Sequence, residues 1–349
     1  MRIDAGLGRS SSADTPETQT DILEEMKLVS NRVNSVLDKV LSRGSPEVLY
    51  MASRHLIKAG GKMLRPYLTF KSCELLGGDV EAVLPSAAAV ELLHTFTLIH
   101  DDIIDHDEVR RGVPTVHSLW GIPLAIVAGD LLFAKVGDTI TGHTNHTRVS
   151  PQQILRVLAT LNNATVNICE GQVLDMIFPS IEGVSEDDYV TMIGKKTSYL
   201  FKAAAEIGGI IGGGSEEEIA SLGRFAYAAG LAFQITDDVL GLTSTLQELG
   251  KPVGSDLKGG KKILPLIYAI SHLTAEERAK IQGLLSGSPR PEEIIWVRNL
   301  IDSTGAIQYA STKAREYLAK ALSELEMFTE NAAKRALVKF SHFLVERRF

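Results

Sequence analysis

The chain has 349 residues, enough for one large domain or two ordinary ones, and 44% of them are apolar, as in a globular protein with a sizeable core. The formal net charge of −7, with Lys and Arg scattered in short clusters, argues against nucleic-acid binding. The two cysteines, Cys73 and Cys169, form neither a disulfide framework nor a zinc-binding pattern, and we expect both to be buried thiols.

The N-terminal region carries no targeting signal that we can identify. Residues 1–20 are rich in Ser, Thr, Asp and Gly, which predicts a flexible tail before a single domain over residues 21–349. Arg2 is not followed by the apolar segment of a secretory signal, and no apolar run reaches the roughly 20 residues of a membrane span. We therefore expect a cytoplasmic protein without a transmembrane segment.

Helical periodicity dominates the chain from residue 21 onward. Apolar residues recur at steps of three and four, and Gly and Pro separate the segments. Helices are predicted over 21–44, 46–60, 67–76, 86–111, 124–141, 151–177, 195–207 and 225–238, with amphipathic helices over 263–349 and a loop with a short helix over 113–123. No strand-like alternation persists, so the prediction is an all-α domain, a helical bundle around a hydrophobic core.

The stretch Leu98–Gly112, LIHDDIIDHDEVRRG, holds five acids in eight residues and ends in two arginines. If Ser86–Arg111 is one helix, it spans about 39 Å, and Asp101 stacks above Asp105 on one face. Such a face is either a solvated acidic surface or a divalent-cation site, since Mg²⁺ is usually held by a few carboxylates and substrate phosphates.

A second acidic pair, Asp237 and Asp238, is predicted to end an apolar helix about 135 residues further along. Carboxylates are costly there unless they are paired or bind metal. A Gly-rich loop with several lysines follows, over 250–262. Lysines grouped just after an acidic pair favour anion capture over a merely solvated loop.

Other cationic motifs accompany the two acidic clusters. In GGKMLRP (60–66), a glycine pair allows close backbone approach while Lys62 and Arg65 reach a ligand, although helix ends often look similar. KKT places Lys195 and Lys196 in apolar sequence, where lysines are rare unless an anion meets them. Together these features predict carboxylate-bound metal ions and cations that hold a diphosphate at the mouth of an apolar bundle. The favoured reaction is departure of that diphosphate to leave an allylic cation in a dry cavity.

The ordered set GGKMLRP, HTFTLIHDDIIDHDEVRRG, GQVLD, KKT, FQITDD and GKPVGSD…GGK resembles the trans-prenyl diphosphate synthases of the polyprenyl synthetase family, closest to the archaeal type of geranylgeranyl diphosphate synthase. The resemblance implies an all-α fold around a central cavity and a homodimer. It also implies condensation of isopentenyl diphosphate with dimethylallyl, geranyl or farnesyl diphosphate by ionisation, condensation and elimination, with three Mg²⁺ ions per active site. The released diphosphate would remove the final proton.

The resemblance also implies a role for each matching residue. Asp101, Asp102 and Asp105 match the first aspartate-rich motif, whose outer members bind Mg²⁺, and Asp237 and Asp238 match the second, whose first member binds another ion. Gln172 and Asp175 match a supporting shell, with Asp175 a further metal candidate. The allylic diphosphate would be bound by Arg110, Lys196, Lys251 and Lys261, and isopentenyl diphosphate by Gly61, Lys62, Arg65, His94 and Arg111. Thr197 and Gln234 match the polar groups beside the forming cation.

The second motif departs from the family pattern at Gly241, where many members have a third Asp. Glycine has no side chain to bind metal, but that third Asp is generally less direct in metal binding. We therefore expect activity to survive.

Product length should depend on where the cavity below Asp101 is blocked. Phe96 lies five residues before Asp101, about 7.5 Å along a helix axis, and Thr97 points nearly the same way as Asp101. Phe96 is either ordinary core or the cavity floor. By resemblance, an aromatic residue here favours a twenty-carbon product, with farnesyl second and longer chains third.

Three other classes of protein remain as alternatives. A terpene cyclase shares the first motif but needs no isopentenyl site. An all-α His-Asp phosphohydrolase is suggested by His94 and His100–Asp101 but would need further ligands. A silent regulatory subunit typically loses motif carboxylates, whereas this chain keeps nearly all of them.

Overall fold

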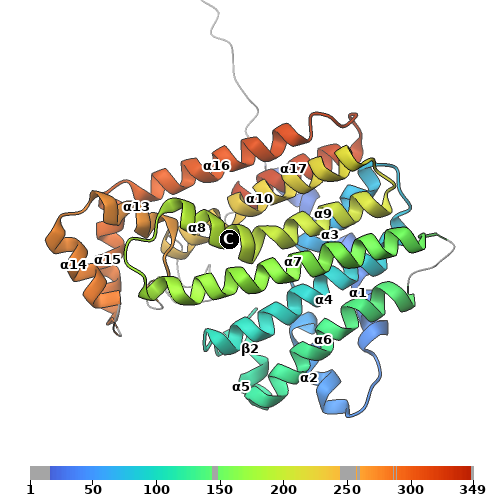
Figure 1. Cartoon of the computed structure of the whole chain (residues 1–349), viewed down its shortest axis with the longest axis horizontal. Helices are drawn as coiled ribbons and strands as arrows, with labels where there is room; N and C mark the ends of the chain where they lie inside the picture. The colour runs from blue at the N-terminus through green and yellow to red at the C-terminus, as the bar shows by residue number, and fades with distance from the viewer. Residues whose placement is uncertain are drawn as a thin grey trace, which may run out of the picture.

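The computed structural model describes residues 16–143, 148–243, 257, 260–285, 287 and 289–346. It confirms the all-α prediction, because long helices lie side by side in a bundle and two further helices, α14 and α15, pack at one end (Figure 1). The helices of the described residues are α1 (Pro16–Leu41), α2 (Glu47–Lys58), α3 (Leu64–Leu75), α4 (Val80–Ile104), α5 (Val116–Trp120), α6 (Ile122–His143), α7 (Pro151–Ile177), α8 (Glu186–Ile193), α9 (Tyr199–Ile211), α10 (Glu216–Thr243), α13 (Leu264–His272), α14 (Ala275–Leu285), α15 (Pro291–Ser303), α16 (Ala306–Glu324) and α17 (Ala332–Glu346).

Helix α4 forms the centre of the bundle and packs against α3, α6 and α9. Its Ala87–Val90 segment is completely buried, as expected of a helix that is apolar on every side. By length and composition alone α4 could cross a membrane, but 72% of its most apolar window is buried inside the bundle. The core of the protein therefore sits directly below the aspartates at the C-terminal end of this helix.

The predicted helix 86–111 is wrong at both ends. Helix α4 begins at Val80, where Asp79 caps it, and ends at Ile104. Acidic side chains disfavour the C-terminal end of a helix, where the helix dipole is negative, and His106 takes a left-handed conformation with φ of 55°. The chain then forms a hairpin of β1 (Val109–Arg110) and β2 (Val113–Pro114), so Arg110 and Arg111 lie beside α4 and not on it.

Several other boundaries differ from the predictions. Helix α1 begins at Pro16 and not at Asp21. Helix α10 continues to Thr243, so Asp237 and Asp238 lie within it and do not end it. Cys73 is buried as expected, whereas Cys169 is exposed on α7. In contrast, α7 occupies the predicted residues, with a capping box between Ser150 and Gln153 at its start.

The KKT segment is helical but of an unusual kind. Residues Gly194–Ser198 form η2, a π-helix between α8 and α9. A Cβ on Gly171 of α7 would lie 2.3 Å from the backbone nitrogen of Lys196, so only glycine lets α7 approach this segment so closely. The wider π-turn directs both Lys196 and Thr197 toward the same cavity, and such turns are frequent at functional sites.

Candidate active site

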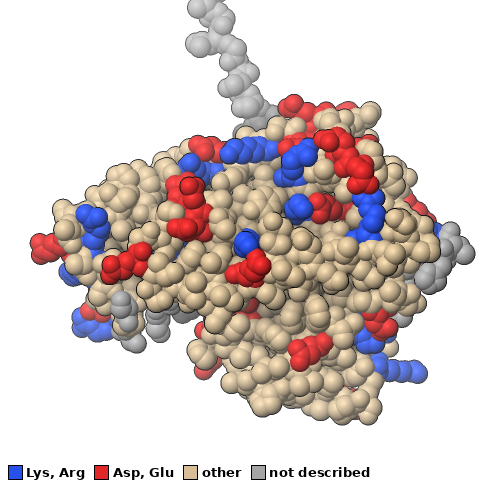
Figure 2. Space-filling view, in the orientation of Figure 1, with Lys and Arg blue, Asp and Glu red and all other residues tan. Residues whose placement is uncertain are grey.

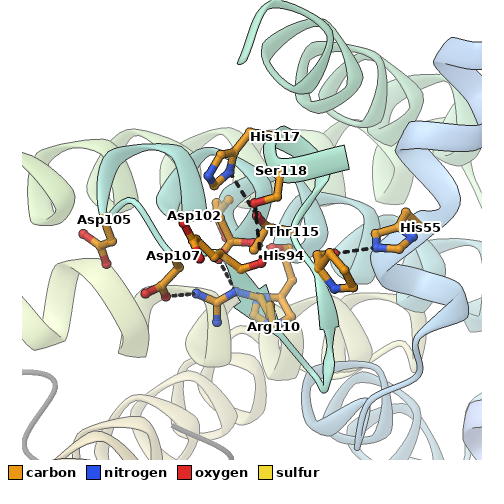
Figure 3. A network of polar contacts seen from close by, with 12 residues as sticks. His55, His94, Asp102, Asp105, Asp107, Arg110, Thr115, His117 and Ser118 are labelled. Carbon is orange, nitrogen blue, oxygen red and sulfur yellow. Dashed lines mark hydrogen bonds and ion pairs between the residues drawn. The ribbon is translucent and has the colours of Figure 1, made fainter. Parts of the chain in front are cut away.

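The aspartates of the first motif lie in two different environments. Asp102 is almost fully buried and its Oδ1 accepts a hydrogen bond from Nε of Arg110, which also contacts Asp107 at 3.2 Å (Figure 3). Asp105 points away from this cluster in the same view (Figure 3). Asp102 thus supports the hairpin through Arg110, while Asp101 and Asp105 face the cavity cations.

Asp101 and Asp105 differ in their readiness to ionise. Burial raises the pKa of Asp101 to about 6, with a further rise from Asp105, while Lys196 and Arg110 act in the opposite direction. Burial also tends to raise the pKa of Asp105, but the charge and hydrogen bond of Lys261 outweigh it, and the pKa is lowered. Both carboxylates are thus mostly ionised at pH 7, and a cation that approaches this face meets two negative groups.

Lys261 joins two acidic groups from separate parts of the chain. Its Nζ lies 2.9 Å from Oδ2 of Asp105, the residue directly after α4, and 3.8 Å from Oδ2 of Asp175 on α7. Lys196 reaches the same Asp175 oxygen at 2.6 Å. The predicted residues 105, 175, 196 and 261 therefore meet, although they come from four separate parts of the chain.

A network of hydrogen bonds lies next to the ion pairs of Lys196 and Lys261 and lines the same cavity as these lysines. Thr197 donates to Oε1 of Gln234 (2.9 Å), Gln234 donates through Nε2 to Oδ1 of Asp238 (2.9 Å), and the phenol of Tyr189 donates to Oδ2 of Asp238 (2.6 Å). These four side chains, with Asp175, Lys196 and Lys261, line a cavity of about 90 Å³. Asp238 is therefore occupied by hydrogen bonds, which agrees with Asp237 as the metal-binding member of the second motif.

A second cationic cluster lies next to the acidic motifs, since Arg65 interacts with Asp237 and His94 lies two turns before Asp101 on α4. Arg65 and His94 contact each other at 3.2 Å, and the guanidinium of Arg111 lies 3.7 Å from Oε1 of Glu91. Burial lowers the pKa of Arg65 to about 10, opposed by Glu91 and Asp237. Burial and the adjacent arginines lower the pKa of His94 well below 6.5, so His94 is neutral at pH 7. The cluster thus carries more positive than negative charge in a buried setting, which suits an incoming anion.

Three further predicted residues, Gly61, Lys62 and Gln172, lie in the part of the chain that the structure describes. Lys62 lies 5.4 Å above the ring of Phe343, and a Cβ on Gly61 would lie 2.9 Å from the Arg111 guanidinium. Gln172 is buried, and within the described residues neither polar atom of its side chain has a hydrogen-bond partner. Lys251 lies outside the described residues.

The two chain-length candidates behave differently. The ring of Phe96 packs against His100 (4.8 Å between centroids) and Phe133 of α6 (5.3 Å). Thr97 donates its hydroxyl to the backbone oxygen of His94, so its side chain folds against its own helix. Phe96 therefore forms part of an aromatic layer, and Thr97 does not.

Comparison with known proteins decides what kind of site this is. Residues 46–301 match the polyprenyl synthetase family, and this segment includes every predicted site residue. The chain belongs to the polyprenyl synthetase family.

Individual relatives of this polyprenyl synthetase span nearly its whole length. A short chain isoprenyl diphosphate synthase of Methanothermobacter thermautotrophicus is 40% identical and aligns over 94% of this chain and 99% of its own. A geranylgeranyl diphosphate synthase of Methanosarcina mazei is 37% identical over 94% and 98%, respectively. The crystal structure of geranylgeranyl pyrophosphate synthetase from Pyrococcus horikoshii superposes with a TM-score of 0.86, at 36% identity, over 95% of this chain and 99% of that one. These relatives confirm the resemblance, the fold and the assignment to the prenyltransferases.

Polyprenyl synthetases use Mg²⁺, and the residues present fit this ion. The acidic groups supply only carboxylate oxygens, the ligands that hard cations prefer. Within the described residues no three His, Cys, Asp or Glu side chains are grouped closely enough to hold a metal by themselves. This agrees with ions that take one or two ligands from the protein and the others from a diphosphate.

Two residues of the synthetase site were missed by sequence reasoning. Glu91 is buried and interacts with Arg65 and Arg111, and an acid in the apolar run VELLHTF was a signal that could have identified it. Tyr189 lies 49 residues before its partner Asp238, and the sequence around it contains no comparable signal.

Proposed function

We propose that this chain is a Mg²⁺-dependent prenyl diphosphate synthase that condenses isopentenyl diphosphate with dimethylallyl, geranyl and farnesyl diphosphates, with geranylgeranyl diphosphate as the favoured product. The observation that carries the proposal is the contact of Lys261 with both Asp105 and Asp175. It places acidic groups at the end of α4 and on α7 within reach of a single cation. One diphosphate with bound metal ions can bridge groups so arranged.

The allylic diphosphate would lie in the cavity between the two acidic motifs. Asp101 and Asp105 on one side, and Asp237 with Asp175 on the other, would hold three Mg²⁺ ions. The same diphosphate would be bound by Arg110, Lys196, Lys251 and Lys261. When bound, the ions supply Lewis-acid stabilisation of the leaving diphosphate. The lysines now paired with Asp105 and Asp175 would exchange these carboxylates for diphosphate oxygens.

Isopentenyl diphosphate would bind the second cationic cluster. Arg65, Arg111, Lys62 and His94 would face this site from four parts of the chain, and Gly61 leaves room beside Arg111. His94, neutral at pH 7, can donate one hydrogen bond without adding charge. The excess positive charge of the cluster favours a diphosphate over an uncharged ligand.

The chemistry follows from these positions. The bond between the allylic carbon and the diphosphate oxygen breaks, and its electron pair leaves with the diphosphate. The double bond of isopentenyl diphosphate then attacks the allylic cation, and the departed diphosphate takes the proton that this step releases. Thr197 and Gln234 face the cation with oxygen atoms, while the apolar core below them excludes water.

The aromatic layer supports a product of limited length. Phe96 stands below the first motif with Phe133 and His100 packed against it. A growing chain that runs down α4 would meet this layer, which would limit its length, and twenty carbons is the limit that the family resemblance implies. Farnesyl diphosphate is the second candidate, and longer polyprenyl products are the third.

We further propose a homodimer of single-domain subunits, each spanning residues 21–349, in the cytoplasm. Large apolar side chains are exposed along α6 and α7, and the molecular face over these helices carries few charges (Figure 2). They are Ile122, Ile126, Val127 and Phe133 on α6 and Leu155, Val166, Val173, Met176 and Ile177 on α7. An exposed patch of this extent is typical of a protein interface, and a second copy would cover both helices symmetrically.

Product sizing tests the proposed function. The purified chain is incubated with Mg²⁺, labelled isopentenyl diphosphate and each allylic diphosphate, and the products are dephosphorylated and separated by chromatography. The proposal predicts labelled linear alcohols that end at twenty carbons. Cyclic hydrocarbons would indicate a terpene cyclase, release of phosphate alone would indicate a phosphohydrolase, and no reaction by the purified chain would indicate a regulatory subunit.

A further inference from the structure

The polar network beside the cavity forms a chain of hydrogen bonds from three helical elements. Tyr189 of α8 is completely buried, Thr197 belongs to η2, and Gln234 and Asp238 belong to α10. The three hydrogen bonds measure 2.6 Å, 2.9 Å and 2.9 Å in order from Tyr189 to Thr197. The chain thus links a phenol at the back of the site with the hydroxyl that faces the substrate cavity.

The donors and acceptors of this network can be arranged in only one way. A carboxylate only accepts, so Asp238 takes the O–H of Tyr189 on Oδ2 and an N–H of Gln234 on Oδ1. The amide nitrogen of Gln234 is thereby directed toward Asp238, and the amide oxygen must face Thr197 and accept its hydrogen. The lone pairs of Thr197 Oγ1 are left on the side of the cavity, next to the oxygen of Gln234.

This direction matters for a reaction that passes through a cation. Oxygen lone pairs held toward a developing positive charge stabilise it, whereas N–H groups held there would oppose it. The reversed orientation of Gln234 is prevented only while Asp238 stays in place as an acceptor. Tyr189 is the buried donor on the far oxygen of that carboxylate, and burial and Asp238 raise its pKa well above the usual value, so it keeps its proton.

We propose that Tyr189 is a positioning residue that fixes Asp238, and through it the direction of the network, so that Gln234 and Thr197 present oxygen atoms to the allylic cation. The inference rests on the proposed prenyl transfer. Although Tyr189 lines the cavity, it donates its only hydroxyl hydrogen to Asp238 and so acts on the cation through two other side chains.

The test compares Tyr189→Phe with Tyr309→Phe. Both variants remove one phenol oxygen that donates to a carboxylate, but neither Tyr309 nor its partner Glu186 lines the cavity. We expect Tyr189→Phe to lower kcat by about 10- to 100-fold, as when one positioned group in a charge-stabilising site is lost, with KM for isopentenyl diphosphate unchanged. Tyr309→Phe should retain the wild-type kcat.

A binding measurement separates positioning from a purely structural role. The probes are an allylic diphosphate analogue with an ammonium group at the cationic carbon and a neutral analogue of the same shape. Tyr189→Phe should weaken binding of the ammonium analogue about tenfold and leave binding of the neutral one unchanged. Equal loss for both probes, or wild-type kcat in Tyr189→Phe, would overturn the inference.

Asp238→Asn provides a second route if Tyr189→Phe does not fold. An asparagine can donate to Gln234 and so permit the reversed amide, which predicts the same selective loss for the ammonium analogue. Equal loss of binding for the ammonium and the neutral analogue in Asp238→Asn would also reject the inference. Failure of the wild-type chain to incorporate isopentenyl diphosphate would instead reject the proposed function, so the two failures are distinguishable.

Discussion

Replacement of Phe96 by alanine should lengthen the product by one isoprene unit. The residue lies about 7.5 Å below Asp101 along α4, at 1.5 Å per residue. Removal of its ring leaves Phe133, whose ring centroid lies 5.3 Å from that of Phe96, as the barrier that we expect next. The five added carbons would gain about 4 kcal/mol on burial, at about 0.8 kcal/mol per carbon, enough to move the product distribution almost completely.

The assay for Phe96→Ala is chromatography of the dephosphorylated products, with turnover measured in parallel. The matched control is Phe328→Ala, which removes a buried ring from the same core outside the two substrate sites. It should lower the free energy of unfolding, by up to about 3–5 kcal/mol, without changing product length. The double variant Phe96→Ala and Phe133→Ala should reach longer products than the single one. An unchanged twenty-carbon product from Phe96→Ala would refute Phe96 as the floor of the cavity. Products of equal length from the single and the double variant would refute the role of Phe133 as a second barrier.

Four further predictions concern the charged groups and the second motif. Asp101→Ala should lower kcat by at least about 10³-fold in a steady-state assay because a metal ligand is lost, whereas Glu276→Ala, which removes an exposed acid on α14, should have no effect; near-normal turnover of Asp101→Ala would rule out the metal assignment. Gly241→Asp should change kcat by less than about tenfold, because the wild-type motif already lacks that ligand; a larger change would show that position 241 takes part directly. Glu91→Gln should destabilise the fold by about 3 kcal/mol in denaturant unfolding, because the buried arginines lose their counter-charge, and should lower KM for isopentenyl diphosphate, because the positive excess of the cluster grows; a raised or unchanged KM would contradict this role. The pKa of His94 in the folded chain is depressed below its unfolded value of 6.5, so the unfolded chain binds more protons below that pH. The free energy of unfolding should therefore fall on acidification by up to about 1.4 kcal/mol per pH unit. His94→Gln should remove that part of the pH dependence, and an identical slope would contradict a buried neutral imidazole.

The sequence predicted the helices well where the signals are local. Residues 151–177 were predicted as one helix and form α7, because Ser150, Pro151 and the following apolar spacing mark its start. The end of α4 was missed, because the prediction relied on the absence of Gly and Pro. The ion pair that holds Arg110 against Asp102 in the hairpin is a tertiary contact that no helical periodicity reveals.

The site residues show the same contrast between local sequence signals and tertiary contacts. Asp105, Asp175, Lys196 and Lys261 were named from motifs and meet in the structure, although the motifs give no distances. Tyr189 could not be named, because its role depends on contact with Asp238 across the bundle. The residues that carry charge within motifs were thus predictable, and those that hold them in place from other helices were not.

The stoichiometry of diphosphate release tests the central claim most directly. The chain is given Mg²⁺, farnesyl diphosphate and labelled isopentenyl diphosphate, and released diphosphate and labelled product are counted in the same sample. Prenyl transfer predicts one diphosphate released for each isopentenyl unit incorporated into a twenty-carbon product. Diphosphate release without incorporation of label would contradict the account, because the allylic cation would then be consumed by water or by cyclisation.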